Sequence, residues 1–226
     1  MISLMNIKQL ELCIIVVFFY AAVGGCASLI AGRIDLPFFW AVFVVQMLVG
    51  LVSVFVLEPD LISERITPRG KDEDPRATLV LSILLLLGLV ISAVDVGRFH
   101  VSDNVPQFLQ GVFLLLSAAG WAGFIWSMSV NRFFSSAIRL QSDRGQTVIE
   151  SGPYRFVRHP GYATASLALL SQSIALGSWL GVLPTVVLVI VLMKRTIFEE
   201  EFLLEQLDGY KEYVQSVRWR WYPGIW

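Results

Sequence analysis

Long apolar runs are the feature that most constrains this chain, because they recur along most of its 226 residues. A helix that crosses a bilayer needs about 20 mainly apolar residues. Only 15% of the residues are charged, whereas a soluble domain usually carries about 25%. The sequence therefore predicts an all-α, polytopic integral membrane protein with about six transmembrane helices, the last two forming a hairpin. The expected spans are residues 10–30, 37–57, 77–96, 105–130, 160–176 and 179–194.

The basic residues are distributed unevenly between the two sides that six spans would create. Of the 17 Lys and Arg residues, only Arg33 and Arg98 lie in the segments on the side opposite the termini. Because cytoplasmic loops carry the excess of Lys and Arg, this bias predicts that both termini are cytoplasmic. We expect the membrane to be a bacterial inner membrane, with a helical C-terminal extension in the cytoplasm.

Several classes of function are disfavoured. The net charge is −1 and no basic stripe is present, so we expect no nucleic-acid partner. Cys13 and Cys26 share the first apolar run and lie too far apart on one helix for a disulfide; no metal site is expected. We interpret this run as an uncleaved membrane helix rather than a signal peptide. Asp95 is the only ionisable residue well inside a span, and we interpret it as interfacial rather than part of an ion path.

Two polar clusters flank the predicted hairpin. The first, residues 151–162, contains Arg158 and His159 directly before Pro160. Proline suits the first position of a helix, and the free N–H groups of a helix start bind anions. Arg158 and His159 could therefore receive a carboxylate or phosphate, although anchoring to lipid headgroups is the alternative.

The second cluster, residues 195–203, continues the last apolar run into water. Arg195 and Glu199 are four apart and share a helix face, whereas Glu200 points about 100° away and can serve another partner. A solvated helix end is the alternative. An acidic cluster opposite a basic one is suited to a zwitterion. The aromatic tail, residues 218–226, is typical of a membrane-interface belt and could instead cap a pocket.

These motifs, in this order, resemble the isoprenylcysteine carboxyl methyltransferase family, and phospholipid N-methyltransferases share a similar ending. The resemblance covers residues 131–226, so we expect a four-helix transmembrane region at 1–130 and a catalytic region at 131–226. Thr164 is a departure, because the family commonly has glycine there, and it could reshape the pocket beside Tyr162. The matching residues are Gly152, Pro153, Tyr154, Arg158, His159, Pro160, Gly161, Tyr162, Arg195, Glu199, Glu200, Leu203, Tyr210 and Tyr213.

The resemblance implies S-adenosylmethionine as cofactor and a lipophilic or small hydrophobic methyl acceptor from the surrounding membrane lipids. Arg195 and Glu200 would be catalytic, positioning a carboxylate, thiol or amine, and Glu200 is the candidate base for a thiol or amine. Glu199 would bind the cofactor ammonium. The cofactor-binding residues implied are Gly152, Tyr154, Arg158, His159, Tyr162 and Glu199.

The sequence leaves two other functions open. Membrane sterol reductases end in a similar stretch before Pro-Gly-Ile-aromatic, but three consecutive glutamates disfavour a nicotinamide cofactor's 2′-phosphate and no dinucleotide glycine fingerprint is present. A non-catalytic membrane scaffold is the second alternative.

Overall fold

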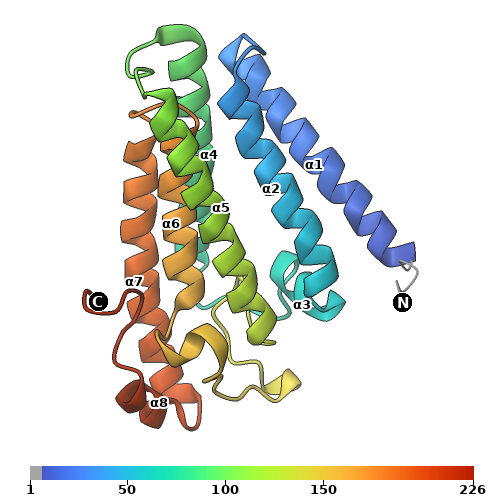
Figure 1. The fold of residues 1–226 in the computed structure, drawn as a ribbon. Coiled ribbons are helices and arrows are strands. Elements are labelled where there is room, and N and C mark those ends of the chain that lie inside the picture. The colour runs from blue at the N-terminus through green and yellow to red at the C-terminus, as the bar shows by residue number, and fades with distance from the viewer. Residues whose placement is uncertain (1–6) are drawn as a thin grey trace.

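The computed structural model describes residues 7–226, and within this range the chain is helical without strands (Figure 1). Five long helices and one shorter helix run roughly along one axis, and two small helices lie at one end. A single π-helical turn, Asp95–Phe99, extends the third long helix. The helices are α1 (Ile7–Ala31), α2 (Pro37–Val56), α3 (Pro59–Ile66), α4 (Pro75–Val94), α5 (Gln107–Val130), α6 (Pro160–Ala175), α7 (Val182–Gln206) and α8 (Tyr210–Ser216).

Among the described residues, four helices are long and apolar enough to cross a membrane: α1, α2, α4 with its π-helical turn, and α5. The expected count of six is not confirmed. Helix α6 has 16 residues, and at 1.5 Å per residue it spans about 24 Å, less than a hydrocarbon core of about 30 Å. The apolar part of α7 ends at Lys194. Membrane crossing by α6 and α7 stays a prediction, as does the side on which the termini lie.

Small residues bring α5 and α6 together, as their abundance in α5 predicts. A Cβ atom on Gly120 would lie 2.7 Å from the backbone nitrogen of Ala168. One on Gly123 would lie 2.7 Å from the methyl carbon of Thr164. Thr164 therefore packs against α5, and it does not line the cavity described below. The expectation that it reshapes the pocket beside Tyr162 is not supported, because residues two apart on a helix point to nearly opposite sides.

The end of the bundle away from α3 and α8 is held by Asp95, which is 2% exposed. Its carboxylate accepts hydrogen bonds from the backbone N–H groups of Val101 and Ser102, both at 2.9 Å. The hydroxyl of Ser178 donates to the same carboxylate at 2.6 Å. The expected interfacial residue is therefore a buried connection between the α4–α5 loop and the α6–α7 turn, where Gly177 has a φ of +92°.

At the other end, the long segment between α5 and α6 folds together with α3, the end of α7 and the C-terminal tail. Figure 1 places the N-terminal end of α1, α3 and α8 at this same end of the bundle. Residues from all these polar segments meet here, and the candidate site is found among them.

Candidate functional site

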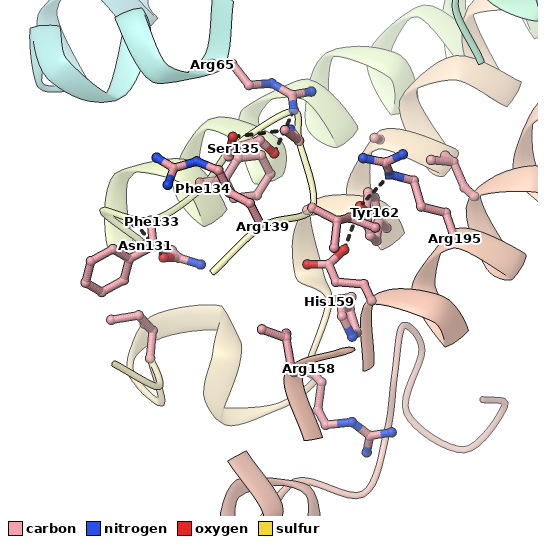
Figure 2. A pocket seen from close by; sticks show the side chains of 18 of the residues that line it. Arg65, Asn131, Phe133, Phe134, Ser135, Arg139, Arg158, His159, Tyr162 and Arg195 are labelled. Atoms are coloured by element: carbon pink, nitrogen blue, oxygen red, sulfur yellow. Dashed lines mark hydrogen bonds between the residues drawn. The ribbon is translucent and has the colours of Figure 1, made fainter. Parts of the chain in front are cut away.

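A cavity of about 360 Å³ penetrates the polar end of the bundle and continues between the helices. Its volume lies within the range of about 300–1,000 Å³ that is usual for small-molecule sites. Figure 2 shows the polar part, with Arg65, Tyr162, His159 and Arg195 arranged around it. The wall therefore combines residues of α3, the α5–α6 segment, α6 and α7.

The deeper part of the cavity is apolar. Its wall includes Leu81 and Leu85 of α4, Trp121 of α5, and Leu188 and Leu192 of α7. Leu85 is also 49% exposed on the outer surface of the bundle. Within residues 7–226, α4 packs on α7 and α1, and α5 packs on α6 and α2, whereas α4 and α5 hardly touch. The apolar part therefore reaches a side chain, Leu85, that is also exposed on the outer surface of the bundle.

Tyr162 and Glu199 are bonded to each other on the wall of the polar part, and Figure 2 shows Tyr162 facing Arg195 there. The Tyr162 hydroxyl donates to Oε2 of Glu199 at 2.7 Å and accepts from Nε of Arg195 at 3.4 Å. The rings of Tyr162 and His159 are stacked, with centroids 5.8 Å apart. Glu199 is the only carboxylate on the cavity wall among the described residues. A positively charged ligand group in this cavity would thus be attracted to Glu199.

Arg195 lines the cavity and is itself almost fully hydrogen-bonded. Its Nη1 donates to Oγ1 of Thr78 at 2.9 Å, and its Nη2 donates to the carbonyl of Ser136 at 2.9 Å. Asp72 lies 3.6 Å from Nη2. These contacts fix the guanidinium between α4, α7 and the α5–α6 segment, and the nearby acids balance its charge.

Glu200 does not line the cavity. It is 4% exposed, and its two oxygens accept from Nε of Arg158 at 2.5 Å and from Nε of Arg220 at 2.6 Å. Burial alone would raise the pKa of Glu200, but its cationic partners outweigh that effect and lower the pKa to about 2. A carboxylate with so low a pKa is a weak base at neutral pH. This placement differs from the expected catalytic role of Glu200.

The sequence prediction that Glu199 and Glu200 serve different partners is confirmed by these bonds. Arg158 is the partner that turns away from the cavity centre. Besides Glu200, its Nη1 donates to the carbonyls of Val217 and Arg218, at 2.7 and 2.8 Å. Figure 2 shows its guanidinium pointing away from Tyr162. Arg158 thus fastens the C-terminal tail, and few of its N–H groups are free for an anion.

Gly152 and Tyr154 lie in different places relative to the cavity. Gly152 does not line the cavity; it has a φ of +57°, and a Cβ there would lie 2.9 Å from a Val130 methyl carbon. Glycine is required here by backbone conformation and close packing. Tyr154 lines the cavity, and its hydroxyl accepts from Nδ2 of Asn131 at 3.2 Å. Of the residues expected to bind the cofactor, Tyr154, Arg158, His159, Tyr162 and Glu199 reach the cavity wall.

Three buried polar atoms have no hydrogen-bond partner in the described part of the chain, and each belongs to a side chain that lines this cavity. They are Nε1 of Trp121, Nε2 of His159 and the hydroxyl of Tyr210. His159 Nε2 lies 3.3 Å from Oε1 of Glu200 without hydrogen-bond geometry. Buried polar groups are normally satisfied, and these three are therefore available to a polar group that enters the cavity.

Several cavity residues were not expected as site residues from the sequence. Tyr210 and Tyr213 were visible as a Tyr-x-x-Tyr pattern but were not assigned to the site. The others lie in segments without a recognisable motif, and only their position in the fold reveals them. They are Arg65, Trp121, Asn131, Phe133, Phe134, Arg139 and residues 146–149.

The aromatic tail packs into the protein. Trp221 is 3% exposed, its Nε1 donates to Oγ1 of Thr196 at 3.0 Å, and its ring lies 6.3 Å from that of Tyr162. For Trp221 the membrane-belt interpretation is wrong, because a belt residue faces the interface. The tail instead supports the side of Tyr162 that faces away from the cavity.

The described residues form an all-helical bundle with a cavity that is charged at its polar end and apolar within the bundle. Residues 106–208 match the family model described as phospholipid methyltransferase. Within residues 106–208 the chain thus matches a family of membrane methyltransferases related to isoprenylcysteine carboxyl methyltransferase, in agreement with the sequence resemblance. No curated protein matches the chain. The family match begins at residue 106 and includes α5, so the expected division at residue 130 stays a prediction.

Proposed function

We propose that the chain transfers a methyl group from S-adenosylmethionine to a lipophilic acceptor that enters the cavity from the bilayer. The observation that carries this proposal is the composition of the cavity. Its polar end contains Glu199, His159 and Tyr154, and its inner part is walled by leucines of α4 and α7. A water-soluble donor and an apolar acceptor can therefore meet in one enclosed space.

The polar end offers a partner for each charge of an amino-acid group, the ammonium and the carboxylate. Glu199 would bind the ammonium, since no other described carboxylate reaches the wall. His159, whose Nε2 lacks a partner, and the start of α6 at Pro160 would receive the carboxylate. S-adenosylmethionine, when bound, supplies an already activated methyl group. The unpartnered hydroxyl of Tyr210 offers a further polar contact on the same wall.

The acceptor would lie in the inner, apolar part. Enclosure and alignment supply much of the rate in a displacement at an activated carbon. Arg195, held rigid by its hydrogen bonds, would orient the acceptor. A carboxylate acceptor needs no base, and we favour it because Glu199, the one carboxylate on the wall among the described residues, would be engaged by the cofactor ammonium. Glu200 would act as a positioning residue for Arg158 and His159.

Binding of S-adenosylhomocysteine to the purified chain in detergent tests this proposal by calorimetry. Glu199→Gln removes one charge-assisted contact, which is worth about 1.5–3 kcal/mol, so affinity should fall roughly tenfold or more. Glu201→Gln is the matched control, because Glu201 is exposed and outside the cavity wall. It should bind like the wild type. Unchanged binding by Glu199→Gln would refute the site assignment, and stabilisation by NADPH alone would favour the reductase alternative.

A further inference from the structure

Arg65, at the end of α3, lies on the cavity wall. Its guanidinium carbon lies 5.6 Å from the ring centre of Phe124 and 5.5 Å from that of Phe134. Its Nη1 donates to the carbonyl of Ser135 at 3.1 Å, the contact seen at the top of Figure 2. Aromatic rings attract a guanidinium and fix its plane. Arg65 is thus held in position, while most of its five N–H groups make no hydrogen bond to the described chain.

Arg65 has no direct ion-pair partner, although the charge of Glu199 on the same cavity wall acts on it. The neighbouring Glu64 is fully buried and accepts from Arg139, at 3.2 Å from Nε and 3.0 Å from Nη2. No carboxylate of residues 7–226 forms an ion pair with Arg65 within 4.0 Å. Arg139 and Arg195, the other cationic residues near it on this wall, both have acidic partners. Arg65 therefore places at the cavity a positive charge that no described carboxylate pairs with directly.

Burial is the largest effect and lowers the pKa of Arg65; Arg195 acts in the same direction, whereas Tyr162 and Glu199 act to raise it. A guanidinium nevertheless keeps its proton in proteins. A charge that is withdrawn from water and lacks a partner is costly. Such a group is expected where a ligand provides the opposite charge, and the planar fork of arginine matches the oxygens of a carboxylate or phosphate.

We infer that Arg65 binds an anionic oxygen group, a phosphate or a carboxylate, carried by the lipophilic acceptor. This inference rests on the proposed function, because it assumes that the apolar part of the cavity holds the acceptor's chain. Arg65 would then select anionic amphiphiles over neutral lipids of equal length. The cofactor's own carboxylate is the competing partner, and the experiment separates the two.

The test measures binding of three probes with one matched 18-carbon chain to the full-length protein in detergent: oleoyl lysophosphatidic acid, oleate and oleyl alcohol. Native mass spectrometry in the presence of S-adenosylhomocysteine gives the affinities. The wild type should bind at least one anionic probe about tenfold more tightly than oleyl alcohol, and the preferred probe identifies phosphate or carboxylate. Arg65→Gln should abolish this preference, and Arg65→Lys should retain part of it.

Arg69→Gln is the matched control. It removes one positive charge from the same segment, but Arg69 is exposed, pairs with Asp60 at 2.6 Å and does not line the cavity. It should keep the wild-type preference. Retained S-adenosylhomocysteine binding shows that the Arg65 variants are folded. Equal affinity of the wild type for all three probes, or an unchanged preference in Arg65→Gln, overturns the inference.

A loss of S-adenosylhomocysteine binding in both Arg65→Gln and Arg65→Lys, with Arg69→Gln unaffected, would assign Arg65 to the cofactor and likewise overturn the inference. Failure of the proposed function gives a different result, since the wild type itself would then not bind S-adenosylhomocysteine.

Discussion

Replacing Glu200 by glutamine should destabilise the protein in a manner that depends on pH. The pKa of Glu200 falls from 4.5 to about 2, so its ionised form is favoured by the fold. At 1.36 kcal/mol per pKa unit, this corresponds to about 3 kcal/mol at neutral pH. The loss of one partner of a buried ion pair typically costs about 3–5 kcal/mol, because the remaining charge is left unpaired. Arg158, which is 6% exposed, is the charge affected.

The sign of the pH dependence follows from the lowered pKa. The stabilisation is fully present above the unfolded pKa of about 4.5 and is lost as the pH falls toward 2. The difference in unfolding free energy between wild type and Glu200→Gln should therefore shrink from about 3 kcal/mol at pH 7 to about 1.5 kcal/mol at pH 3. Reversible unfolding in mixed detergent, followed by tryptophan fluorescence, measures this difference. Glu201→Gln should change stability by less than about 0.5 kcal/mol at both pH values. A difference below 1 kcal/mol at pH 7, or one that does not change with pH, would refute the reasoning.

Two further substitutions test the packing. Gly120→Ala should destabilise the bundle by about 1–3 kcal/mol, because the new methyl group would lie 2.7 Å from the backbone nitrogen of Ala168. Gly111→Ala, whose nearest contact would be at 3.9 Å, is the control and should not lower the melting temperature. Equal effects of the two substitutions would contradict the packing argument. Asp95→Asn should cost about 1.5–3 kcal/mol in the same unfolding assay, because the carboxylate accepts several hydrogen bonds from the α4–α5 loop and the α6–α7 turn; wild-type stability would show that those bonds contribute nothing net.

The parts of the fold and site that depend on local sequence could be predicted. Apolar runs of about 20 residues predict α1, α2, α4 and α5 because the bilayer sets the length of a helix. The separation of Glu199 from Glu200 follows from the 100° turn per residue of a helix. The same geometry places Thr164 on the opposite side of α6 from Tyr162, so its packing against α5 could have been foreseen.

The remaining features depend on distant segments coming together. The sequence shows that Glu200 follows Glu199, but only the folded tail, through Arg220, shows that Glu200 is enclosed. Arg65 stands next to Glu64 on α3, but adjacent residues of a helix point in different directions, so no local rule assigns a partner to either. In the structure Glu64 forms its ion pair with Arg139, about 75 residues away, and Arg65 lies at the cavity. Long-range choices of partner of this kind are not encoded in any short motif.

The arrangement of Glu199 and Glu200 explains why this site needs the C-terminal tail although the tail does not line the cavity. Glu200 and Arg158 hold the backbone of residues 217–220, through the Val217 carbonyl at 2.7 Å and the Arg220 side chain at 2.6 Å. The tail then places Trp221 behind Tyr162, and Tyr162 holds Glu199 at the cavity. One acid of the pair therefore fixes the structure that positions the other. Because the two acids lie on one rigid helix turn, a change at Glu200 should be transmitted to ligand binding at Glu199 without any direct contact with the ligand.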